Sequence, residues 1–329
     1  MLDEPPGPPV TTVLLGPQRF TTTVQTVLRS LPVDGPVAMV NAGWEEREAD
    51  DAELAGLLDH RGVNLRLYQR AVEALASDRA LRRAALAHRT AHAELRAFYG
   101  IRLQSAWDTV LAVRRRTSRP TTPGVAEGAL RSALQALRDV DDWYAFEVGR
   151  IVAATVGSDA VRSSELLARH RGEVAEIISG ASVVVLAGGH VGVLMDTLRL
   201  LEVTLPAGTP VIAWSAGAMA VCDPIVLFHD FAPQGVTAPE VHDRGLARLR
   251  GIIPLPHARR RLALDHHERM AVFAERFAGH RLVPLDDGTV LRFAAPANGW
   301  GDGPRGVVDP PEGARVLGRD GTVRTWAAS

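Results

Sequence analysis

Several features that identify whole classes of proteins are missing from this chain of 329 residues. Its one cysteine, Cys222, cannot form an internal disulfide, which excludes a disulfide-stabilised scaffold. No apolar stretch reaches the roughly 20 residues that a membrane-spanning helix needs. Even the run of residues 177–186 is short and is soon followed by Gly188 and Gly189. The sequence therefore predicts a soluble protein without a membrane partner.

The chain also has no strong net charge of either sign. The 37 basic and 38 acidic residues leave a net charge of −1, so the composition indicates no nucleic-acid partner. Residues 1–9 have neither the basic start nor the apolar run of a secretory signal. We therefore expect a cytoplasmic protein that acts on a small molecule. Whether it forms a homodimer is left open.

Short, continuously apolar segments are present towards both ends of the chain. Continuous rather than alternating apolarity is typical of strands that are buried on both faces, as in a parallel sheet flanked by helices. The sequence thus predicts an α/β fold, as one elaborated domain or as two. The predicted strands are residues 12–15, 37–41, 65–68, 183–187 and 211–214.

A segment of different composition separates the third and fourth of these strands. Residues 71–171 are rich in Ala, Leu, Arg and Glu, which favour helices. We predict a helical insertion here, which divides the catalytic domain into residues 1–70 and 172–329. A basic, proline-bearing loop is expected at residues 114–124. Its arginines either lie in solvent or bind a polyanion, and the lack of interleaved aromatic residues favours solvent.

The segment after residue 215 alternates between loops and short regular elements. A strand is predicted at residues 251–255 and a helix at 264–277. Two further strands, 281–285 and 289–293, are separated by Asp-Asp-Gly, a turn sequence that predicts a β-hairpin. The tail, with residues 315–317 and 323–326 around a second Asp-Gly pair, predicts another hairpin.

Ser215 follows the predicted strand 211–214 at once and is followed by small residues and a helical pattern. A strand, a tight turn and a helix form the setting of a nucleophile elbow, which lifts a serine oxygen above the sheet edge. The helix N-terminus favours the negative charge that develops there. The alternative is that Ser215 only caps the helix. Ala213 stands where the usual pattern has its first glycine.

A second strand runs into a turn at Gly188, Gly189 and His190. Paired glycines let backbone N–H groups approach a ligand or an oxyanion closely, and sites gather beyond the ends of parallel strands. The alternative is an ordinary turn at a strand end.

Together, residues 187–190, 208–218 and 256–259 resemble the peptidase E and cyanophycinase family of serine peptidases. The fold of that family is close to that of class I glutamine amidotransferases, so the resemblance implies a three-layer sandwich around a parallel sheet. The resemblance covers residues 183–293 well, the first three strands only by architecture, and the helical insertion not at all.

The resemblance implies a role for particular residues. Ser215 corresponds to the nucleophile, and His257, which follows the predicted strand 251–255, corresponds to the catalytic histidine. Gly189 and Ala216 correspond to the residues that supply the oxyanion donors. His190 stands where many members carry asparagine or aspartate. A serine hydroxyl needs such a base to take its proton, and a third group to orient the imidazole.

Two residues are candidates for that third group. Asp230 lies 15 positions after Ser215, a spacing that resembles peptidase E. Asp287 resembles the acidic residue that cyanophycinases place in a late turn. We favour Asp230 and keep Asp287 open. Either aspartate is also a common turn former.

Contacts with the substrate are expected from the same turns. Gly188, His190 and Trp214 lie at the predicted strand ends, and Arg259 follows the catalytic histidine. A guanidinium suits a substrate carboxylate, and peptidase E acts on peptides that begin with aspartate. The alternative for Arg259 is a solvated helix start.

Other histidines lie in helical segments without the spacing of a metal site, so we expect neither a metal nor another cofactor. They are His60, His88, His92 and His170.

The leading hypothesis is a serine hydrolase that cleaves a peptide or isopeptide amide through an acyl-enzyme. The alternatives are acyl transfer or a specialised amidase reaction at the same site, and an inactive binding module of the same fold. The inactive module is kept as an alternative because Ala213 and His190 depart from the usual residues at their positions. A true glutamine amidotransferase is not expected, because its elbow residue is a cysteine and Cys222 lies seven residues beyond Ser215.

Overall fold

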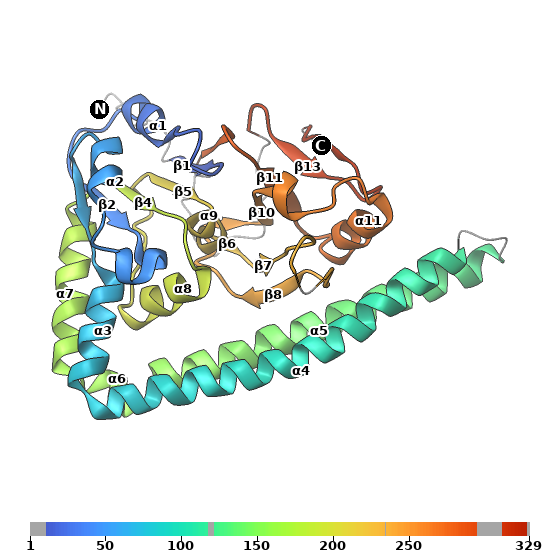
Figure 1. Ribbon diagram of the computed structural model, residues 1–329, viewed down its shortest axis with the longest axis horizontal. Helices are drawn as coiled ribbons and strands as arrows, with labels where there is room; N and C mark the ends of the chain where they lie inside the picture. The colour runs from blue at the N-terminus through green and yellow to red at the C-terminus, as the bar shows by residue number, and fades with distance from the viewer. Residues whose placement is uncertain (1–10, 118–121, 234, 295–310, 328–329) are drawn as a thin grey trace, which may run out of the picture.

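The fold was analysed in a computed structural model, which describes residues 11–117, 122–233, 235–294 and 311–327. A six-stranded sheet lies at its centre, with the strand order β12-β1-β5-β4-β2-β3 (Figure 1). Strand β12 is antiparallel to β1, and all other pairs in this sheet are parallel. The strands are β1 (Thr11–Leu15), β2 (Val37–Val40), β3 (Gly62–Asn64), β4 (Val183–Leu186), β5 (Val211–Trp214) and β12 (Val290–Ala294).

Helices bury both faces of this sheet. Successive residues of a strand point to opposite faces, and Val184 and Val185 accordingly belong to two different hydrophobic clusters. The cluster around Val185 contains α1 (Val24–Ser30) and α2 (Ala52–Leu57). The cluster around Val184 contains α3 (Leu67–Ser77), α7 (Glu165–Ser179) and α8 (Val191–Leu200). The predicted α/β class with a parallel sheet between two helical layers is confirmed.

The third strand lies earlier in the chain than predicted. Residues 65–68 were expected to be a strand, but β3 covers Gly62–Asn64 and α3 begins at Leu67. The buried carboxylate of Glu48 accepts hydrogen bonds from the backbone N–H groups of residues 68 and 69. This contact caps the first turn of α3, and an apolar pattern alone does not reveal it.

The described residues of the predicted insertion are mostly helical and form two kinds of helix. Helices α3 and α7 pack on the central sheet, whereas α4 (Arg79–Thr117) and α5 (Pro123–Val156) form a long antiparallel hairpin along one side of the molecule (Figure 1). The short helix α6 (Asp159–Arg162) follows the hairpin. Residues 114–116 were expected in a loop but form the last turn of α4, where positive charge stabilises a helix end.

A buried polar cluster fixes the hairpin to the rest of the protein. The Asp141 carboxylate of α5 accepts a hydrogen bond from the Tyr99 hydroxyl of α4 at 2.8 Å and pairs with Arg276 of α11 (His267–Arg276). The Tyr99 hydroxyl oxygen in turn accepts from Arg276 at 3.0 Å and from the Val241 N–H at 3.0 Å. Every member of this cluster has a partner, so the hairpin is anchored at its middle.

The C-terminal part contains a second, smaller parallel pair of strands. Strand β10 (Ile252–Pro256) pairs with β11 (Arg281–Leu285), while β12 crosses to the central sheet and pairs with β1. The predicted hairpin of residues 281–293 is therefore wrong, although both strands exist. Residues 286–289 lead the chain from β11 to the central sheet. There Thr289 O accepts a hydrogen bond at 2.8 Å from Gly16 N, the residue after β1.

The predicted hairpin of the tail is confirmed, because β13 (Arg315–Leu317) and β14 (Val323–Thr325) pair antiparallel. The predicted helix of residues 264–277 corresponds to α11. The remaining elements are η1 (Ala42–Arg47), α9 (Ala216–Val221), α10 (Ala258–Arg261), β6 (Cys222–Asp223), β7 (Ile225–Leu227), β8 (Glu240–Asp243) and β9 (Leu249–Arg250).

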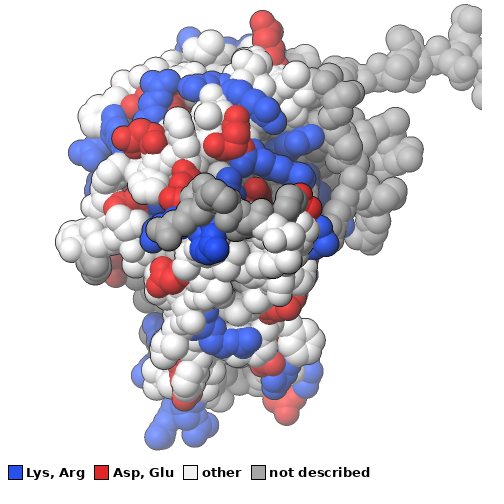
Figure 2. Space-filling view, turned by 90° about the vertical axis from the view of Figure 1, so that its right-hand side faces the viewer, with Lys and Arg blue, Asp and Glu red and all other residues white. Residues whose placement is uncertain are grey.

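In the described part of the chain, no helix combines the length and the apolarity that crossing a bilayer requires. Basic and acidic side chains lie intermixed on the described part of the face shown in Figure 2.

Candidate active site

Ser215 occupies a sharp turn between β5 and α9. Its backbone has φ 50° and ψ −118°. This conformation is unfavourable for a residue that has a side chain, and residues that adopt it are found mainly at functional sites. Gly217 makes the turn possible, because a Cβ there would lie 2.2 Å from the carbonyl oxygen of Leu186. The Ser215 side chain makes no capping hydrogen bond to α9. The turn thus has the geometry of a nucleophile elbow, and its hydroxyl is not used as a helix cap.

His257 faces this hydroxyl from the end of β10. Its Nε2 lies 3.3 Å from Ser215 Oγ. The residue has a left-handed backbone with φ 56°, and its N–H donates to the Leu285 carbonyl at 3.0 Å. The backbone therefore holds the imidazole beside the serine, within the distance at which a base in an unliganded site takes a proton.

The surroundings keep this imidazole neutral. Partial burial and then the positive charge of Arg261 lower the pKa of His257, while Asp287 acts against them. A histidine with a lowered pKa is unprotonated at neutral pH and can accept a proton from the serine.

The two candidate acids differ in their environment. The Asp230 carboxylate is buried and accepts hydrogen bonds from Arg269 at 2.7 Å and from the Ala263 N–H at 2.9 Å. Among the described residues, no hydrogen bond joins Asp230 to His257. Asp287 lies close enough to His257 to influence its pKa, and its Oδ2 accepts a hydrogen bond from Arg260 at 2.9 Å. The structure therefore does not support the preference for Asp230, whose carboxylate neutralises a buried arginine instead.

The glycine turn lies directly beside the elbow. A Cβ on Gly188 would lie 2.9 Å from Ser215 Cβ, so the two turns touch. Gly189 has φ 123°, and a Cβ there would lie 2.2 Å from the carbonyl oxygen of Gly43. In the described part of the chain, the Gly189 N–H has no acceptor. The Ala216 N–H, at the first position of α9, also lacks an acceptor within its helix. Both predicted oxyanion donors thus lie at the two turns that meet beside Ser215.

Two of the predicted substrate contacts have structural partners. The His190 side chain caps α8, because its Nδ1 accepts a hydrogen bond from Val193 N at 3.1 Å. The Trp214 side chain is buried in the cluster that contains Val13 and Val185, beneath the turn. Trp214 therefore supports the turn from the core side, whereas His190 remains exposed at the turn itself.

The three arginines after His257 are not equivalent. Arg259 contacts Asp286, with the backbone N–H at 3.0 Å from Oδ1 and the side-chain Nε at 3.5 Å from Oδ2. Arg260 binds Asp287. Among the described residues, the guanidinium of Arg261 has no partner, and burial lowers its pKa. The sequence singled out Arg259, but the unpaired cation beside His257 is Arg261, and no sequence pattern separates the three.

Gly43 is a residue of the site that the sequence analysis missed. Its carbonyl accepts a hydrogen bond from His190 N at 2.7 Å, and it packs against the Gly188–Gly189 turn. Its signal in the sequence was its position just after the predicted strand 37–41, at the same sheet edge as the other turns.

No group of three or more potential metal ligands is gathered anywhere in the described ranges. The groups gathered at the site are a serine, a histidine, nearby carboxylates and backbone N–H groups.

A strained serine at a parallel strand end, faced by a histidine, has the arrangement of a nucleophile elbow and its base. The sequence model of peptidase family S51 matches residues 135–296, a span that includes Ser215, His257 and Asp287. Residues 135–296 are thus similar to peptidase family S51, and the expected resemblance to peptidase E and cyanophycinase is confirmed. This match fits the expected class I glutamine amidotransferase-like fold.

One solved structure with a detectable likeness is described as the crystal structure of a peptidase from an acI-B1 Actinobacterium. The two chains are 12% identical, and the comparison covers 86% of this chain and 83% of that one, with a TM-score of 0.41. A comparison with curated proteins returned no match.

Proposed function

We propose that this protein is a serine hydrolase that cleaves a peptide or isopeptide amide through an acyl-enzyme. The observation that carries the proposal is the 3.3 Å separation of Ser215 Oγ and His257 Nε2, at a turn whose backbone is strained and whose hydroxyl caps no helix. The similarity of the matched region to a peptidase family supports the same reaction class.

The reaction follows from this arrangement. His257 takes the proton of the Ser215 hydroxyl as its oxygen attacks the carbonyl carbon of the substrate amide. The negative charge on the carbonyl oxygen is stabilised by the N–H groups of Gly189 and Ala216. His257 then gives its proton to the leaving amine, and an ester on Ser215 remains. Water, deprotonated by His257, attacks this ester and releases the acid.

Asp287 is the acid that we assign to His257, in place of Asp230. Its negative charge raises the pKa of His257 against the effects of burial and Arg261, so it stabilises the imidazolium that forms during attack. Asp230 is engaged with Arg269 and the Ala263 N–H, and contributes to stability instead.

The substrate class that the site suits best carries a carboxylate near the scissile amide, as in a small peptide that contains aspartate. Arg261 supplies the argument, because its guanidinium has no partner among the described residues and lies close enough to His257 to lower the pKa of that histidine. A substrate carboxylate would give this cation the partner that it lacks.

One of the two departures that favoured an inactive module, Ala213, does not disrupt the elbow. Ala213 is fully buried in the sheet, and its methyl group does not prevent the strained turn at Ser215. The loss of the usual first glycine is therefore compatible with an intact elbow.

A panel of dipeptides with and without an aspartyl residue tests the proposal. Ser215→Ala is compared with the parent and with Ser105→Ala, an exposed serine of α4. We expect hydrolysis by the parent and the control, and a loss of at least about 10³-fold for Ser215→Ala. Equal turnover by all three proteins would remove Ser215 from the mechanism.

A further inference from the structure

At its middle, the hairpin of α4 and α5 contacts the rest of the described chain with one side only (Figure 1). Three large apolar side chains of this middle part are exposed to solvent, Phe98 by 57%, Ile101 by 71% and Phe146 by 65%. Single exposed apolar residues are ordinary, whereas a gathered group of them marks an interaction surface. The question is therefore whether these three lie together.

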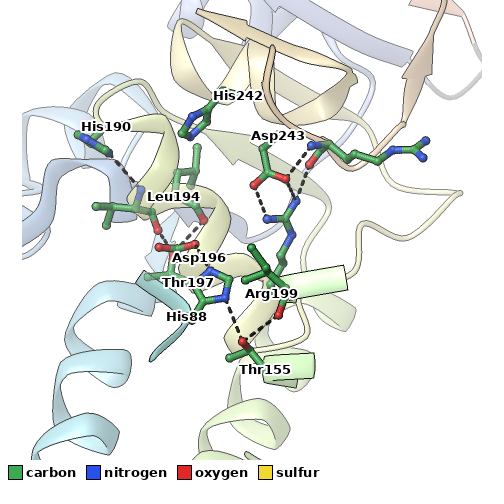
Figure 3. A network of polar contacts seen from close by, with 12 residues as sticks. His88, Thr155, His190, Leu194, Asp196, Thr197, Arg199, His242 and Asp243 are labelled. Carbon is green, nitrogen blue, oxygen red and sulfur yellow. Dashed lines mark hydrogen bonds and ion pairs between the residues drawn. The ribbon is translucent and has the colours of Figure 1, made fainter. Parts of the chain in front are cut away.

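Contacts between the two helices place them at one level of the hairpin. Tyr99 of α4 stacks on Tyr144 of α5, with ring centroids 4.0 Å apart. Nearer the base, His88 Nδ1 of α4 lies 3.0 Å from Thr155 Oγ1 of α5, so the antiparallel register is the same there (Figure 3). The two phenylalanines are one and two positions away from the stacked tyrosines and therefore lie side by side across the hairpin.

All three apolar side chains also lie on the outer face of the hairpin. Tyr99 and Tyr144 are fully buried, and Ile101 and Phe146 follow them by two positions. Two positions correspond to about 200° around an α-helix, so these side chains point away from the body of the protein. Phe98 is only about 60° around the helix from Ile101 and extends the same patch.

An acidic and a basic residue flank each phenylalanine at equal spacing. The acid lies four positions before the phenylalanine, the arginine lies four positions after it, and every member of both triplets is exposed. Positions i, i+4 and i+8 lie along one face of a helix, so each helix presents acid, ring and base in line. The triplets are Glu94, Phe98 and Arg102 on α4, and Asp142, Phe146 and Arg150 on α5.

This order of charges is complementary to itself. A two-fold axis across the hairpin at the level of the phenylalanines sets each helix antiparallel to its own copy. Residues equally far before and after the phenylalanine then meet, so the acid of one copy faces the arginine of the other. Because Phe98 and Phe146 lie at one level, a single axis satisfies both helices. A parallel arrangement would place like charges together.

We propose that this face binds a second copy of the chain, so that two hairpins form an antiparallel four-helix layer. Phe98, Ile101 and Phe146 form the apolar centre of the interface, and the charged residues form its rim. The 34 residues of α5 span about 50 Å, and two adjacent helices are about 20 Å wide. This face has room for the roughly 800 Å² per partner that a stable interface buries. The interface does not depend on the chemistry proposed at Ser215.

Sedimentation velocity of the full chain between about 1 and 100 µM tests the interface. We expect a dimer for the parent and a monomer for the double variant Phe98→Asp with Phe146→Asp, which gathers four carboxylates at the axis. Circular dichroism checks that this variant is folded. Phe231→Asp, at a side chain that is 59% exposed outside the hairpin, is the matched control and should remain a dimer. A parent that is monomeric at the highest concentration, or a dimer that the double variant leaves intact, overturns the proposal.

Charge reversal tests the antiparallel orientation. Glu94→Arg faces Arg102 of the partner subunit, and Arg102→Glu faces Glu94 of the partner subunit, so each should weaken dimerisation by at least about tenfold. The variant with both substitutions should return the Kd to within about threefold of the parent value. Within one chain the two positions are about 12 Å apart along α4, so this recovery reports contact between copies. A double variant that dimerises no more tightly than the single variants overturns the proposal.

Discussion

The polar groups of the buried hairpin junction are paired with one another, whereas some polar groups at the active-site turns have no partner. At the hairpin, Tyr99, Asp141 and Arg276 satisfy one another away from water. At the turns, the Ser215 hydroxyl caps no helix, and the guanidinium of Arg261 has no partner among the described residues. Polar groups that are fully paired contribute stability, whereas groups held without partners are available for chemistry. Substitutions in the two regions should therefore have different consequences.

The largest effect on stability is expected at the hairpin junction. Asp141→Ala leaves the buried Arg276 without its carboxylate and should lower the free energy of unfolding by about 3–5 kcal/mol. Urea denaturation measures this change. Asp142→Ala, at the exposed neighbouring position, is the control and should change stability by less than about 0.5 kcal/mol. Equal effects of the two substitutions would contradict the assignment of this cluster to stability.

A smaller effect separates the two aspartates that the sequence offered for the triad. Asp287→Asn should lower kcat by roughly 10–100-fold with little change in unfolding, because it removes a charge that stabilises the imidazolium. Asp230→Asn should lower stability, since Arg269 loses its buried partner, and should leave kcat of the folded protein near the parent value. Steady-state kinetics and urea denaturation of both variants check this. The opposite pattern would restore Asp230 as the triad acid.

The smallest effect concerns pH. Because Arg261 lowers the pKa of His257, Arg261→Gln should raise it. The neutral imidazole is the active form, so the acid limb of kcat/KM should move to higher pH, and KM for a carboxylate-bearing substrate should rise. Arg259→Gln is the control, since Arg259 is paired with Asp286. An unchanged acid limb in Arg261→Gln would place this arginine outside the site.

Much of the catalytic region could be predicted because it depends on local signals. Continuous apolarity marks buried strands, and small residues after β5 mark a turn that only they can adopt, as the contact of Gly217 with the Leu186 carbonyl shows. The parallel sheet and the elbow at Ser215 depend on these signals, whereas His257 was identified through the resemblance to the peptidase E and cyanophycinase family.

Features that depend on long-range partners could not be predicted. Strand β11 pairs with β10 and β12 with β1, although an Asp-Asp-Gly turn lies between β11 and β12. The choice among strand partners depends on packing across the whole molecule, which local turn chemistry does not encode. The roles of Asp230 and Arg261 were missed for a similar reason, because each depends on whether a partner distant in the sequence, such as Arg269, is present.

Labelling with a fluorophosphonate, followed by peptide mapping, tests the central claim most directly. The claim is that His257 activates the Ser215 hydroxyl at a strained turn. The account predicts an adduct on Ser215 in the parent, and labelling slowed by at least about 10³-fold in His257→Ala. An adduct on another serine, or labelling of Ser215 at the same rate without His257, would contradict it.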